Sequence, residues 1–391
     1  MLKQILLKKK LDAILVSSVP NIVYLTGYSG FSKDEREAYL FICKNKQYII
    51  TDGRYSEAVR VHIPHFELIE RTIHNTTDDI FKKLMKKHKI KRLGIEENNL
   101  TVSEYKKIKR CFNDLNHFSI SSIRAIKTQD EILAIEQTCK LGDKTFSYIL
   151  KKIKKGISEK EVAFELEMFI KKNGGELSFP TIVAFGKNSA TPHHQTSNER
   201  LSLNRHSGKP KAHPESDSGQ ARMTPGQFVL LDFGVKLNNY CSDMTRTVFF
   251  GKPTSEQKKM YETVLIAQTK AMEYLKKCHS ERSEESRSFD KILQDNIWAK
   301  EVDKVARDYI TSQGYPSIPH SLGHGIGIEV HESPSLSPNS KEVLKEGMVF
   351  SIEPGIYIPG FGGVRMEDLV VLKKTGPRIL TTSSSLLTLV G

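Results

Sequence analysis

Two segments of this chain, 226–234 and 347–355, repeat the same order of residue types. In each, a glycine is followed six residues later by a carboxylate, Asp232 or Glu353, and then by another glycine. The residues between are apolar and strand-like, and each segment follows a pair of predicted helices. Because acids occupy the equivalent position in both copies, we interpret 123–391 as an internally duplicated domain with pseudo-twofold symmetry.

Each copy carries a second acid beyond a turn. Asp232 and Asp243 lie symmetrically about the turn at 237–239, so a tight hairpin would place them opposite each other with Cβ atoms about 5 Å apart. Glu353 and Glu367 lie symmetrically about the centre of a glycine-rich turn. We therefore predict two β-hairpins that each present a pair of carboxylates.

Symmetry of this kind brings the two acidic hairpins together. Neighbouring carboxylates repel one another strongly unless a cation lies between them. The four acids are enough to hold two divalent ions roughly 3.5–4 Å apart, as in two-metal hydrolases. His324 lies among glycines that allow a close approach of the backbone, and a neutral imidazole suits such a site. From the residues alone, exposed strand acids and an ordinary polar histidine remain the alternative.

Helix starts in this second domain have capping-box spacing. Thr128 and Ser158 are each followed three residues later by glutamate, so that hydroxyl and carboxylate satisfy the first backbone N–H groups. Two further helical stretches begin at Thr254 and Trp298. Polar segments near 202–223 and 279–296 have little periodicity, so we expect them to be surface insertions.

Residues 1–122 alternate between short strand-like and helix-like stretches. We predict strands near 13–16, 39–43, 47–51, 66–69 and 92–95 and helices near 54–61, 77–88 and 101–110. The pattern indicates a separate α/β domain without a catalytic cluster, followed by the duplicated domain at 123–391.

The acids and His324, together with Pro192, His193 and the stretch 323–332, resemble the signature of the pita-bread metallopeptidases. That family includes aminopeptidase P, prolidase and methionine aminopeptidase. The resemblance covers about 128–391 apart from the two insertions. It implies an α+β pita-bread catalytic domain. Residues 1–122 resemble the creatinase/prolidase amino-terminal domain, which methionine aminopeptidases lack, and this favours the proline-directed branch.

The resemblance implies a role for each matching residue. Five match the metal ligands of the family: Asp232, Asp243, His324, Glu353 and Glu367. Two histidines, His193 and His331, match residues that act on the substrate or the tetrahedral intermediate, and the neighbouring His194 is the less favoured candidate. Three more match residues that support the ligands or line the substrate pocket: His320, Tyr357 and Arg365.

The expected enzyme is a hydrolase that cleaves the bond before proline in small peptides with proline at the second position. A hydroxide bridging two divalent ions would attack the carbonyl, and Glu353 would act in catalysis by relaying the proton. An oxygen-rich site with one histidine suits Mn²⁺, while Co²⁺, Fe²⁺ and Zn²⁺ are alternatives. The resemblance also implies a homodimer. Aminopeptidase and dipeptidase activities are equal alternatives here.

Composition excludes several other classes. No stretch reaches ~18 apolar residues and the start of the chain has no signal-like apolar core, so we expect a cytoplasmic protein that does not act at a membrane. The five cysteines lack zinc or redox spacing, which predicts reduced thiols. Residues 1–127 hold 24 Lys/Arg and 14 Asp/Glu, but no nucleic-acid motif accompanies this charge, so we expect a solvated basic face and no nucleic-acid partner.

Other functions account for part of the pattern. One is a catalytically inactive binding protein with the pita-bread fold, and another is a creatinase-like enzyme that needs no metal. The complete set of ligand-type residues argues against both. A nucleic-acid-binding module built on the basic amino-terminal half is the third alternative.

Overall fold

The structure, a computed structural model, describes residues 6–112, 114–202, 226–280 and 296–390. The chain divides into two compact units, Met1–Arg124 and Ala125–Gly391. The bulk of the polar segments expected near 202–223 and 279–296 lies outside the described residues. Every described helix is too short or too polar to cross a bilayer. The five cysteines carry free thiols, as predicted.

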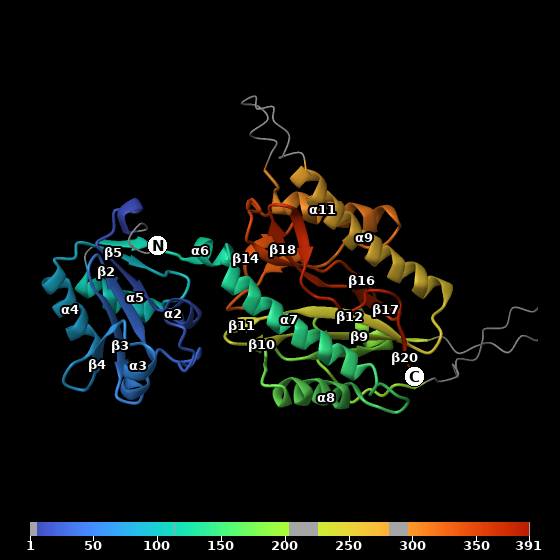
Figure 1. The fold of residues 1–391 in the computed structure, drawn as a ribbon, viewed down its shortest axis with the longest axis horizontal. Coiled ribbons are helices and arrows are strands. Elements are labelled where there is room, and N and C mark those ends of the chain that lie inside the picture. Colours follow the sequence, from blue (N-terminus) through green and yellow to red (C-terminus); the bar gives the residue numbers. More distant parts are fainter. Residues whose placement is uncertain (1–5, 113, 203–225, 281–295, 391) are drawn as a thin grey trace, which may run out of the picture. The chain divides into compact units, whose positions relative to one another are not determined.

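One six-stranded sheet forms the centre of the amino-terminal unit, in the order β4-β3-β2-β1-β5-β6 (Figure 1). Its strands are β1 (Ala13–Val16), β2 (Tyr39–Cys43), β3 (Gln47–Asp52), β4 (Glu67–Arg71), β5 (Arg92–Ile95) and β6 (Asp114–His117). Its helices are α2 (Val19–Thr26), α3 (Ser56–His62), α4 (Thr77–His88) and α5 (Val102–Cys111), and α6 (Ser121–Ala125) ends the unit. The predicted α/β pattern is confirmed.

Three elements of this unit were not predicted, namely β6, α2 and the short helix α6. The strand β6 has the polar sequence Asp-Leu-Asn-His and lies at the sheet edge beside β5, so no apolar alternation marks it. The helix α2 begins with Val19-Pro20, and proline is tolerated in a first helical turn because the N–H there has no helical partner anyway. The proline therefore does not exclude a helix here, although we predicted none.

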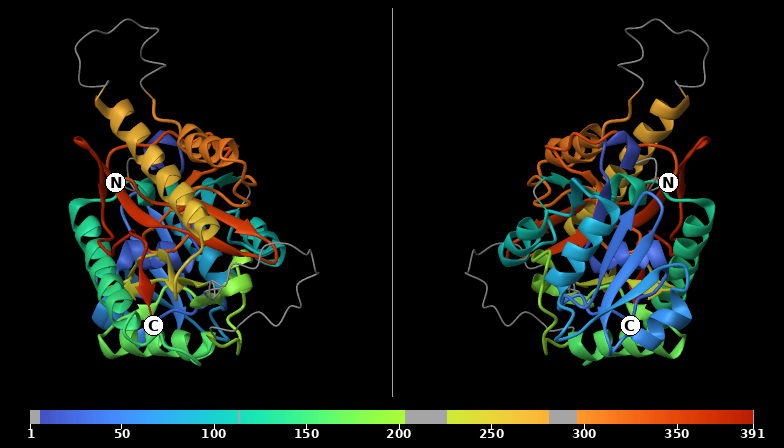
Figure 2. Two further views of the ribbon diagram at one scale, coloured as in Figure 1. Left: turned by 90° about the vertical axis from the view of Figure 1, so that its right-hand side faces the viewer. Right: turned by 90° about the vertical axis from the view of Figure 1, so that its left-hand side faces the viewer.

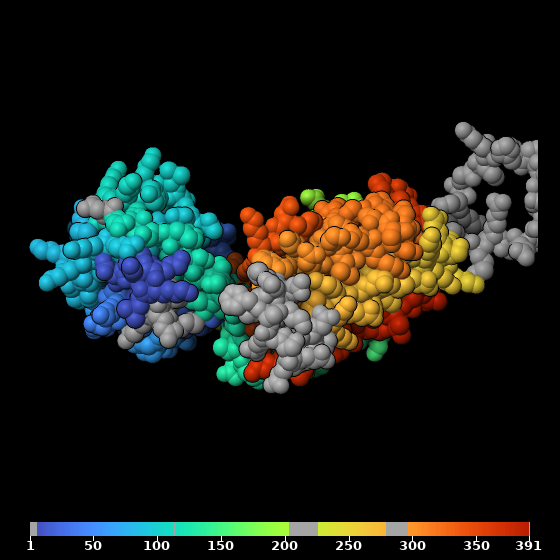
Figure 3. Space-filling view, turned by 90° about the horizontal axis from the view of Figure 1, so that it is seen from above, coloured from blue at the N-terminus to red at the C-terminus, as the bar shows by residue number. Residues whose placement is uncertain are grey.

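Four long helices flank the strands in the described part of the second unit. They are α7 (Gln129–Ile149), α8 (Glu159–Lys172), α9 (Ser255–Ser280) and α11 (Ala299–Ser312). The strands lie between the pair α9/α11 and the pair α7/α8 (Figures 1 and 2). The helices α9 and α11 pack side by side at the surface (Figure 3). Thr128 and Ser158 form the predicted capping boxes.

Each helix pair is followed by an antiparallel ribbon, as the internal repeat predicts. In the first ribbon β9 (Gln227–Phe233) pairs with β12 (Met244–Phe250), and the pair is flanked by β8 (Ile182–Phe185) and β20 (Leu389–Val390). The ribbon continues into the short hairpin of β10 (Val235–Leu237) and β11 (Tyr240–Cys241). The strand β10 also pairs with β7 (Glu176–Leu177). In the second, β15 (Val349–Ile352) pairs with β18 (Asp368–Lys373) in the order β14-β13-β15-β18-β19, and it continues into β16 (Gly355–Ile358) and β17 (Gly362–Arg365). The other three strands are β13 (Gly323–Gly325), β14 (Glu332–Leu336) and β19 (Gly376–Ile379).

The two hairpins differ from each other in register. In the second, Ile352 pairs with Asp368 and Gly355 with Arg365, so the predicted register, which places Glu353 opposite Glu367, is confirmed. In the first, our prediction that Asp232 faces Asp243 is wrong, because Asp232 pairs with Thr245.

The cause of the error is the turn of the first hairpin. Asn238 and Asn239 both have positive φ, 50° and 71°, and form a two-residue turn between Leu237 and Tyr240. Asparagine tolerates this conformation better than most residues, and such turns match the twist of paired strands. The turn is centred one residue later than predicted, so Asp243 lies two residues before the partner of Asp232.

Buried apolar residues fill the space between helices and ribbons. One face of α7 is buried, with Ile135 and Ile149 fully inaccessible to solvent. Residues of β9 such as Val229 and Leu231 join the same core as Leu166 of α8. Burial of each such side chain contributes about 1.5–3 kcal/mol, so the rigid ribbon that carries Asp232 is supported by the helices behind it.

Candidate active site

A cavity of about 490 Å³ in the second unit collects most of the predicted functional residues. Its lining includes all of the predicted ligands, Asp232, Asp243, His324, Glu353 and Glu367. It also includes His193, His320, His331 and Arg365. Tyr357 does not line the cavity, although its hydroxyl contacts His320 and Arg365.

The four acids lie where the paired strands are interrupted. Asp232 is near the end of β9 and Asp243 directly precedes β12, while Glu353 follows β15 and Glu367 precedes β18. The ribbons are joined at this level, because the Thr245 hydroxyl donates to Glu367 Oε2 at 2.8 Å and the Glu367 N–H donates to the Thr245 carbonyl at 3.1 Å. The two acidic hairpins therefore meet, as expected.

His324 completes a compact set of metal-ligating atoms. One ligand atom each from Asp243, His324 and Glu367 lies within 4.8 Å of the others. His324 Nε2 is 3.3 Å from Glu353 Oε1 and 3.6 Å from Asp243 Oδ2. His324 Nδ1 contacts the carbonyl of Gly325 at 3.2 Å, and a carbonyl can only accept. The proton is therefore on Nδ1, and the Nε2 lone pair is directed toward the acids.

The acids of this set are buried without enough partners. Asp243 Oδ1 and Glu367 Oε1 are buried and have no hydrogen-bond partner within the described part of the chain. Burial, together with the charges of the neighbouring acids, raises the pKa of Asp243 and of Glu367 well above the ordinary range. A buried carboxylate without a partner is costly, and a divalent cation removes that cost. The arrangement therefore fits bound divalent ions.

Glu353 and His324 have protonation behaviour suited to such a site. Burial raises the pKa of Glu353 to about 7, opposed by Arg365. Ser351 Oγ donates to Glu353 Oε1 at 3.1 Å and fixes its direction. Burial also lowers the pKa of His324, which keeps the imidazole neutral and able to offer a lone pair.

Arg365 lines the cavity and supports Asp232. Its guanidinium pairs with Asp232 Oδ2 and donates to Tyr357 Oη at 2.9 Å and to the Pro192 carbonyl at 3.2 Å. The Tyr357 hydroxyl lies 2.9 Å from His320 Nε2. Burial lowers the pKa of His320 to about 4, so it is neutral at physiological pH. This chain of contacts fixes Asp232 and the segment before His193 relative to each other.

The structure separates the roles of His193 and His194. His193 is exposed and lines the cavity, whereas His194 does not line it, and its Nε2 lies 2.8 Å from Glu159 Oε2. Glu159 is fully buried and also accepts hydrogen bonds from Phe185, Asn188 and Ser197. Burial would raise the pKa of Glu159, but these hydrogen bonds lower it. Glu159 therefore anchors the loop that presents His193.

His331 lies beside His324 in the cavity. Its ring stands nearly perpendicular to that of His324, with centroids 4.3 Å apart. His331 is exposed to the cavity, and partial burial lowers its pKa. His193 and His331 thus provide two imidazoles beside the carboxylates.

Sequence reasoning did not locate the apolar wall of the cavity. Phe179, Pro180 and Ile182 line one part of it and Val330 another. Phe179 and Pro180 precede β8, Ile182 begins it and Val330 follows β13, so these residues are far apart in sequence, and each reads as an ordinary core or loop residue. No local signal could identify them, because only the packing of the two ribbons gathers them.

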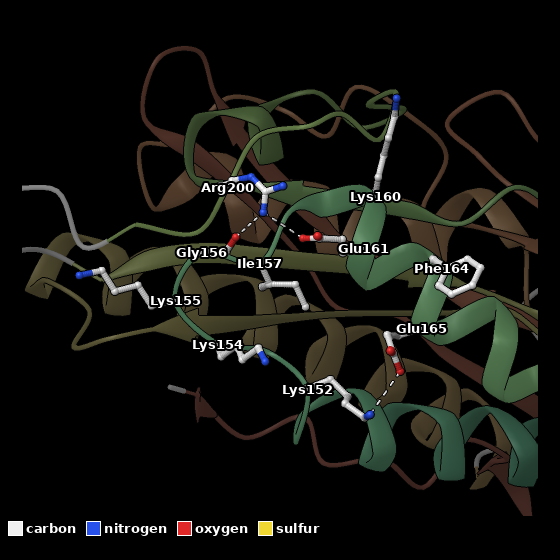
Figure 4. A pocket seen from close by; sticks show the side chains of 10 residues that line it. All are labelled: Lys152, Lys154, Lys155, Gly156, Ile157, Lys160, Glu161, Phe164, Glu165 and Arg200. Carbon is white, nitrogen blue, oxygen red and sulfur yellow. Dashed lines mark hydrogen bonds and ion pairs between the residues drawn. The ribbon is translucent and has the colours of Figure 1, made fainter.

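A second hollow of about 580 Å³ lies between the end of α7 and the start of α8 (Figure 4). Figure 4 shows Lys152 paired with Glu165 and Arg200 paired with Glu161. Its lining, all of it in the described part of the chain, contains no histidine and no group of acids poised to hold an ion. The hollow lacks the groups that hydrolysis needs, so the first cavity is the candidate active site.

The family of the chain follows from comparison with known proteins. The sequence profile of metallopeptidase family M24 matches residues 134–374. The chain belongs to this family. Residues 1–127 match the creatinase/prolidase amino-terminal domain. The expected fold class, an α/β amino-terminal domain followed by a pita-bread catalytic domain, is therefore confirmed, and this M24 protein is a metallopeptidase that uses divalent metal ions.

Proteins similar to this metallopeptidase include enzymes with named activities. An Xaa-Pro dipeptidase of Pyrococcus horikoshii is 34% identical over 96% of this chain and 93% of its own length. The structure of an Xaa-Pro dipeptidase from Bacillus anthracis is 32% identical, with a TM-score of 0.82 over 100% of this chain and 98% of its own. That of an X-Pro aminopeptidase from Thermotoga maritima is also 32% identical, with a TM-score of 0.78 over 97% and 98%.

Proposed function

We propose that this M24 metallopeptidase hydrolyses the peptide bond between an amino-terminal residue and proline, using two divalent metal ions. The ions would be held by Asp232, Asp243, His324, Glu353 and Glu367. The observation that carries the proposal is the pair of buried, partnerless carboxylate oxygens on Asp243 and Glu367 beside the Nε2 lone pair of His324. The named activities of the Pyrococcus, Bacillus and Thermotoga relatives support the choice of substrate.

The ligand set favours Mn²⁺ among the candidate metals. Four carboxylates and one imidazole form a largely oxygen-donor site, which suits a hard ion, and Co²⁺, Fe²⁺ and Zn²⁺ are the alternatives. Divalent ions bound here lower the pKa of water toward neutrality and so supply the nucleophile. Carboxylates of both ribbons are needed, since each ribbon alone contributes only two acids.

Glu353 is placed to handle the proton of the attacking water. Its carboxylate lies in the cavity beside the other acids, where it can take a proton from the attacking water. The hydrogen bond from Ser351 to Oε1 restrains the side chain, which leaves Oε2 as the oxygen for the proton. The same carboxylate then passes the proton toward the leaving proline nitrogen.

His193 and His331 act on the substrate itself. Each imidazole lines the cavity and can donate a hydrogen bond to the carbonyl oxygen as negative charge develops there. Proline in the substrate has no N–H, so its ring must be selected by shape and by apolar contact. Phe179, Ile182 and Val330 provide an apolar wall in the same cavity for that purpose.

Peptidase assays on a matched set of substrates test the proposal. The purified protein with added Mn²⁺ is expected to cleave Xaa-Pro or Xaa-Pro-Xaa peptides and to leave the corresponding Xaa-Ala peptides nearly intact. Removal of the ions by a chelator should abolish cleavage, and Mn²⁺ should restore it. Comparison of Xaa-Pro with Xaa-Pro-Xaa separates dipeptidase from aminopeptidase activity.

The same assay contains the outcomes that contradict the proposal. Cleavage that survives complete removal of metal would exclude the metal-dependent mechanism. Protein that binds no Mn²⁺ and cleaves none of the peptides would favour the inactive binding protein. Equal rates on the proline and alanine peptides would leave a metallopeptidase with a different specificity.

The neighbouring histidines provide an internal control for the substrate-binding role. His193→Ala is expected to lower kcat by roughly 10²–10⁴-fold without loss of stability, since the side chain is exposed to the cavity. His194→Ala removes a partner of the buried Glu159 and should cost about 1–3 kcal/mol of unfolding free energy, with kcat of the folded protein changed far less. Kinetics and urea unfolding of both variants check this, and the reverse pattern would exchange the two roles.

A further inference from the structure

A buried ion pair lies directly beside the loop that carries His331. Lys127 Nζ is 2.7 Å from Glu332 Oε1, and the two side chains are only 1% and 7% exposed. Lys127 precedes the amino-terminal cap of α7, and Glu332 follows His331 and begins β14. No step proposed above uses either residue.

An ion pair at this depth has a cost that requires an explanation. Moving an ammonium and a carboxylate out of water is expensive, and similarly sized apolar residues often stabilise a protein as well or better. Buried pairs are retained in some proteins because they specify one arrangement of the chain.

The carboxylate of Glu332 is part of the loop between β13 and β14. Glu332 pairs with Gly325, the residue after His324, so the two close the loop at its base. The Glu332 side chain folds back over Gly327, where a Cβ atom would collide with the carboxylate. The loop therefore folds over the carboxylate of Glu332, and His331 is the residue directly before Glu332.

Lys127 anchors the charge to a rigid part of the domain. Its N–H donates to the Gly347 carbonyl at 2.8 Å, and the preceding Ile126 bridges to Met348. Thr128, the next residue, caps α7. The ammonium thus extends from the junction of α7 and the second ribbon to the base of the His331 loop.

We propose that Lys127 is a positioning residue, which holds His331 in its catalytic orientation through the buried carboxylate of Glu332. This inference rests on the proposed function in one respect, the action of His331 on the substrate. Its consequence for loop order is independent of activity. Lys127 touches neither the cavity nor the predicted ligands, so metal affinity should not depend on it.

Kinetic coupling between Lys127 and His331 is the decisive measurement. Lys127→Met should lower kcat on an Xaa-Pro peptide by about 10–100-fold, with little change in KM or in Mn²⁺ affinity measured by calorimetry. In the His331→Ala background the same substitution should have almost no further effect on kcat, because residues that act as a unit are not additive. Lys127→Arg, which keeps the charge, should recover part of the loss.

Hydrogen exchange supplies a readout that does not need activity. Amide exchange measured by mass spectrometry should rise in 326–332 of the Lys127→Met variant and stay unchanged in α9. Lys152→Met, which removes a surface lysine paired with Glu165, is the matched control and should leave exchange and kinetics unaltered. If Lys127→Met folds poorly, Lys127→Met/Glu332→Gln removes both charges at once and should show the same increase in loop exchange.

The outcomes distinguish the two proposals. An equal loss of kcat from Lys127→Met with and without His331, or unchanged exchange in 326–332, would overturn the positioning role. A parent protein that cleaves no Xaa-Pro peptide would contradict the proposed function instead, while the exchange result would still decide whether Lys127 orders the loop.

Discussion

Replacement of Asp243 by asparagine is expected to abolish metal binding and peptidase activity and, at the same time, to stabilise the metal-free protein. Asp243 is 5% exposed, and its Oδ1 has no partner among the described residues. Loss of this ligand should reduce kcat by about 1000-fold or more, because stabilisation of the reacting oxygen by a metal ion is worth several kcal/mol. An amide of the same shape carries no charge to bury, so the metal-free variant should gain about 1–3 kcal/mol.

Two measurements check this opposite effect on function and stability. Calorimetry should detect weak or no Mn²⁺ binding, and urea unfolding in chelator should give a higher midpoint than for the parent. Asp303→Asn is the matched control, since Asp303 is equally buried but accepts two hydrogen bonds from Arg307 and should be destabilised by the same change. An Asp243→Asn variant that binds Mn²⁺ and cleaves peptides like the parent would exclude Asp243 as a ligand.

The metal-free protein is expected to lose stability as the pH rises from about 4 to about 8. The pKa of Glu353 is raised to about 7, and the pKa values of Asp243 and Glu367 are raised as well. Between the ordinary carboxyl pKa and these raised values, the folded state binds more protons than the unfolded state. Stability from these groups is therefore complete below about pH 4 and lost as the pH passes through the folded-state pKa.

The size of this effect follows from the same shift. Glu353 alone accounts for on the order of 3 kcal/mol between the two pH limits. Other carboxyls, such as Glu159, have lowered pKa values and act in the opposite direction. The difference in unfolding free energy between the parent and Glu353→Gln, measured in chelator from pH 4 to 8, isolates the contribution of Glu353.

Metal should reverse this pH dependence. Saturating Mn²⁺ is expected to stabilise the parent most at high pH, where the acids are ionised, and least below pH 5. Two outcomes would contradict the view that these acids are mutually repelling ligands. One is equal stabilisation by Mn²⁺ at every pH. The other is a metal-free parent protein that becomes more stable than Asp243→Asn as the pH rises.

Local sequence patterns accounted for the framework of the site. The capping boxes at Thr128 and Ser158, the two ribbons and the register of the second hairpin depend on hydrogen bonds and apolar alternation within short segments. The glycines around Gly360 allow a symmetric turn, so Glu353 and Glu367 could be paired from spacing alone. Spacing alone did not predict the register of the first hairpin, because two adjacent asparagines with positive φ decide where its turn lies.

The hydrogen-bond and ion-pair partners of the functional side chains could not be predicted from local sequence patterns. Glu159 binds His194 and leaves His193 at the cavity, although nothing in the sequence separates the two histidines except resemblance to a family. Arg365 binds Asp232 from 133 residues away, and Lys127 reaches Glu332 across 205 residues. Such contacts depend on how the two ribbons and their helices pack.

By itself, the sequence determined that four acids from two similar ribbons and one histidine would form a metal site, because metal binding requires particular residue types in a particular order. Tertiary structure alone decided which oxygens of those acids lack a partner, which histidine is directed toward the cavity and where the apolar wall lies. The physical reason is that burial and charge repulsion depend on distances between residues far apart in the chain, and only the folded domain sets those distances.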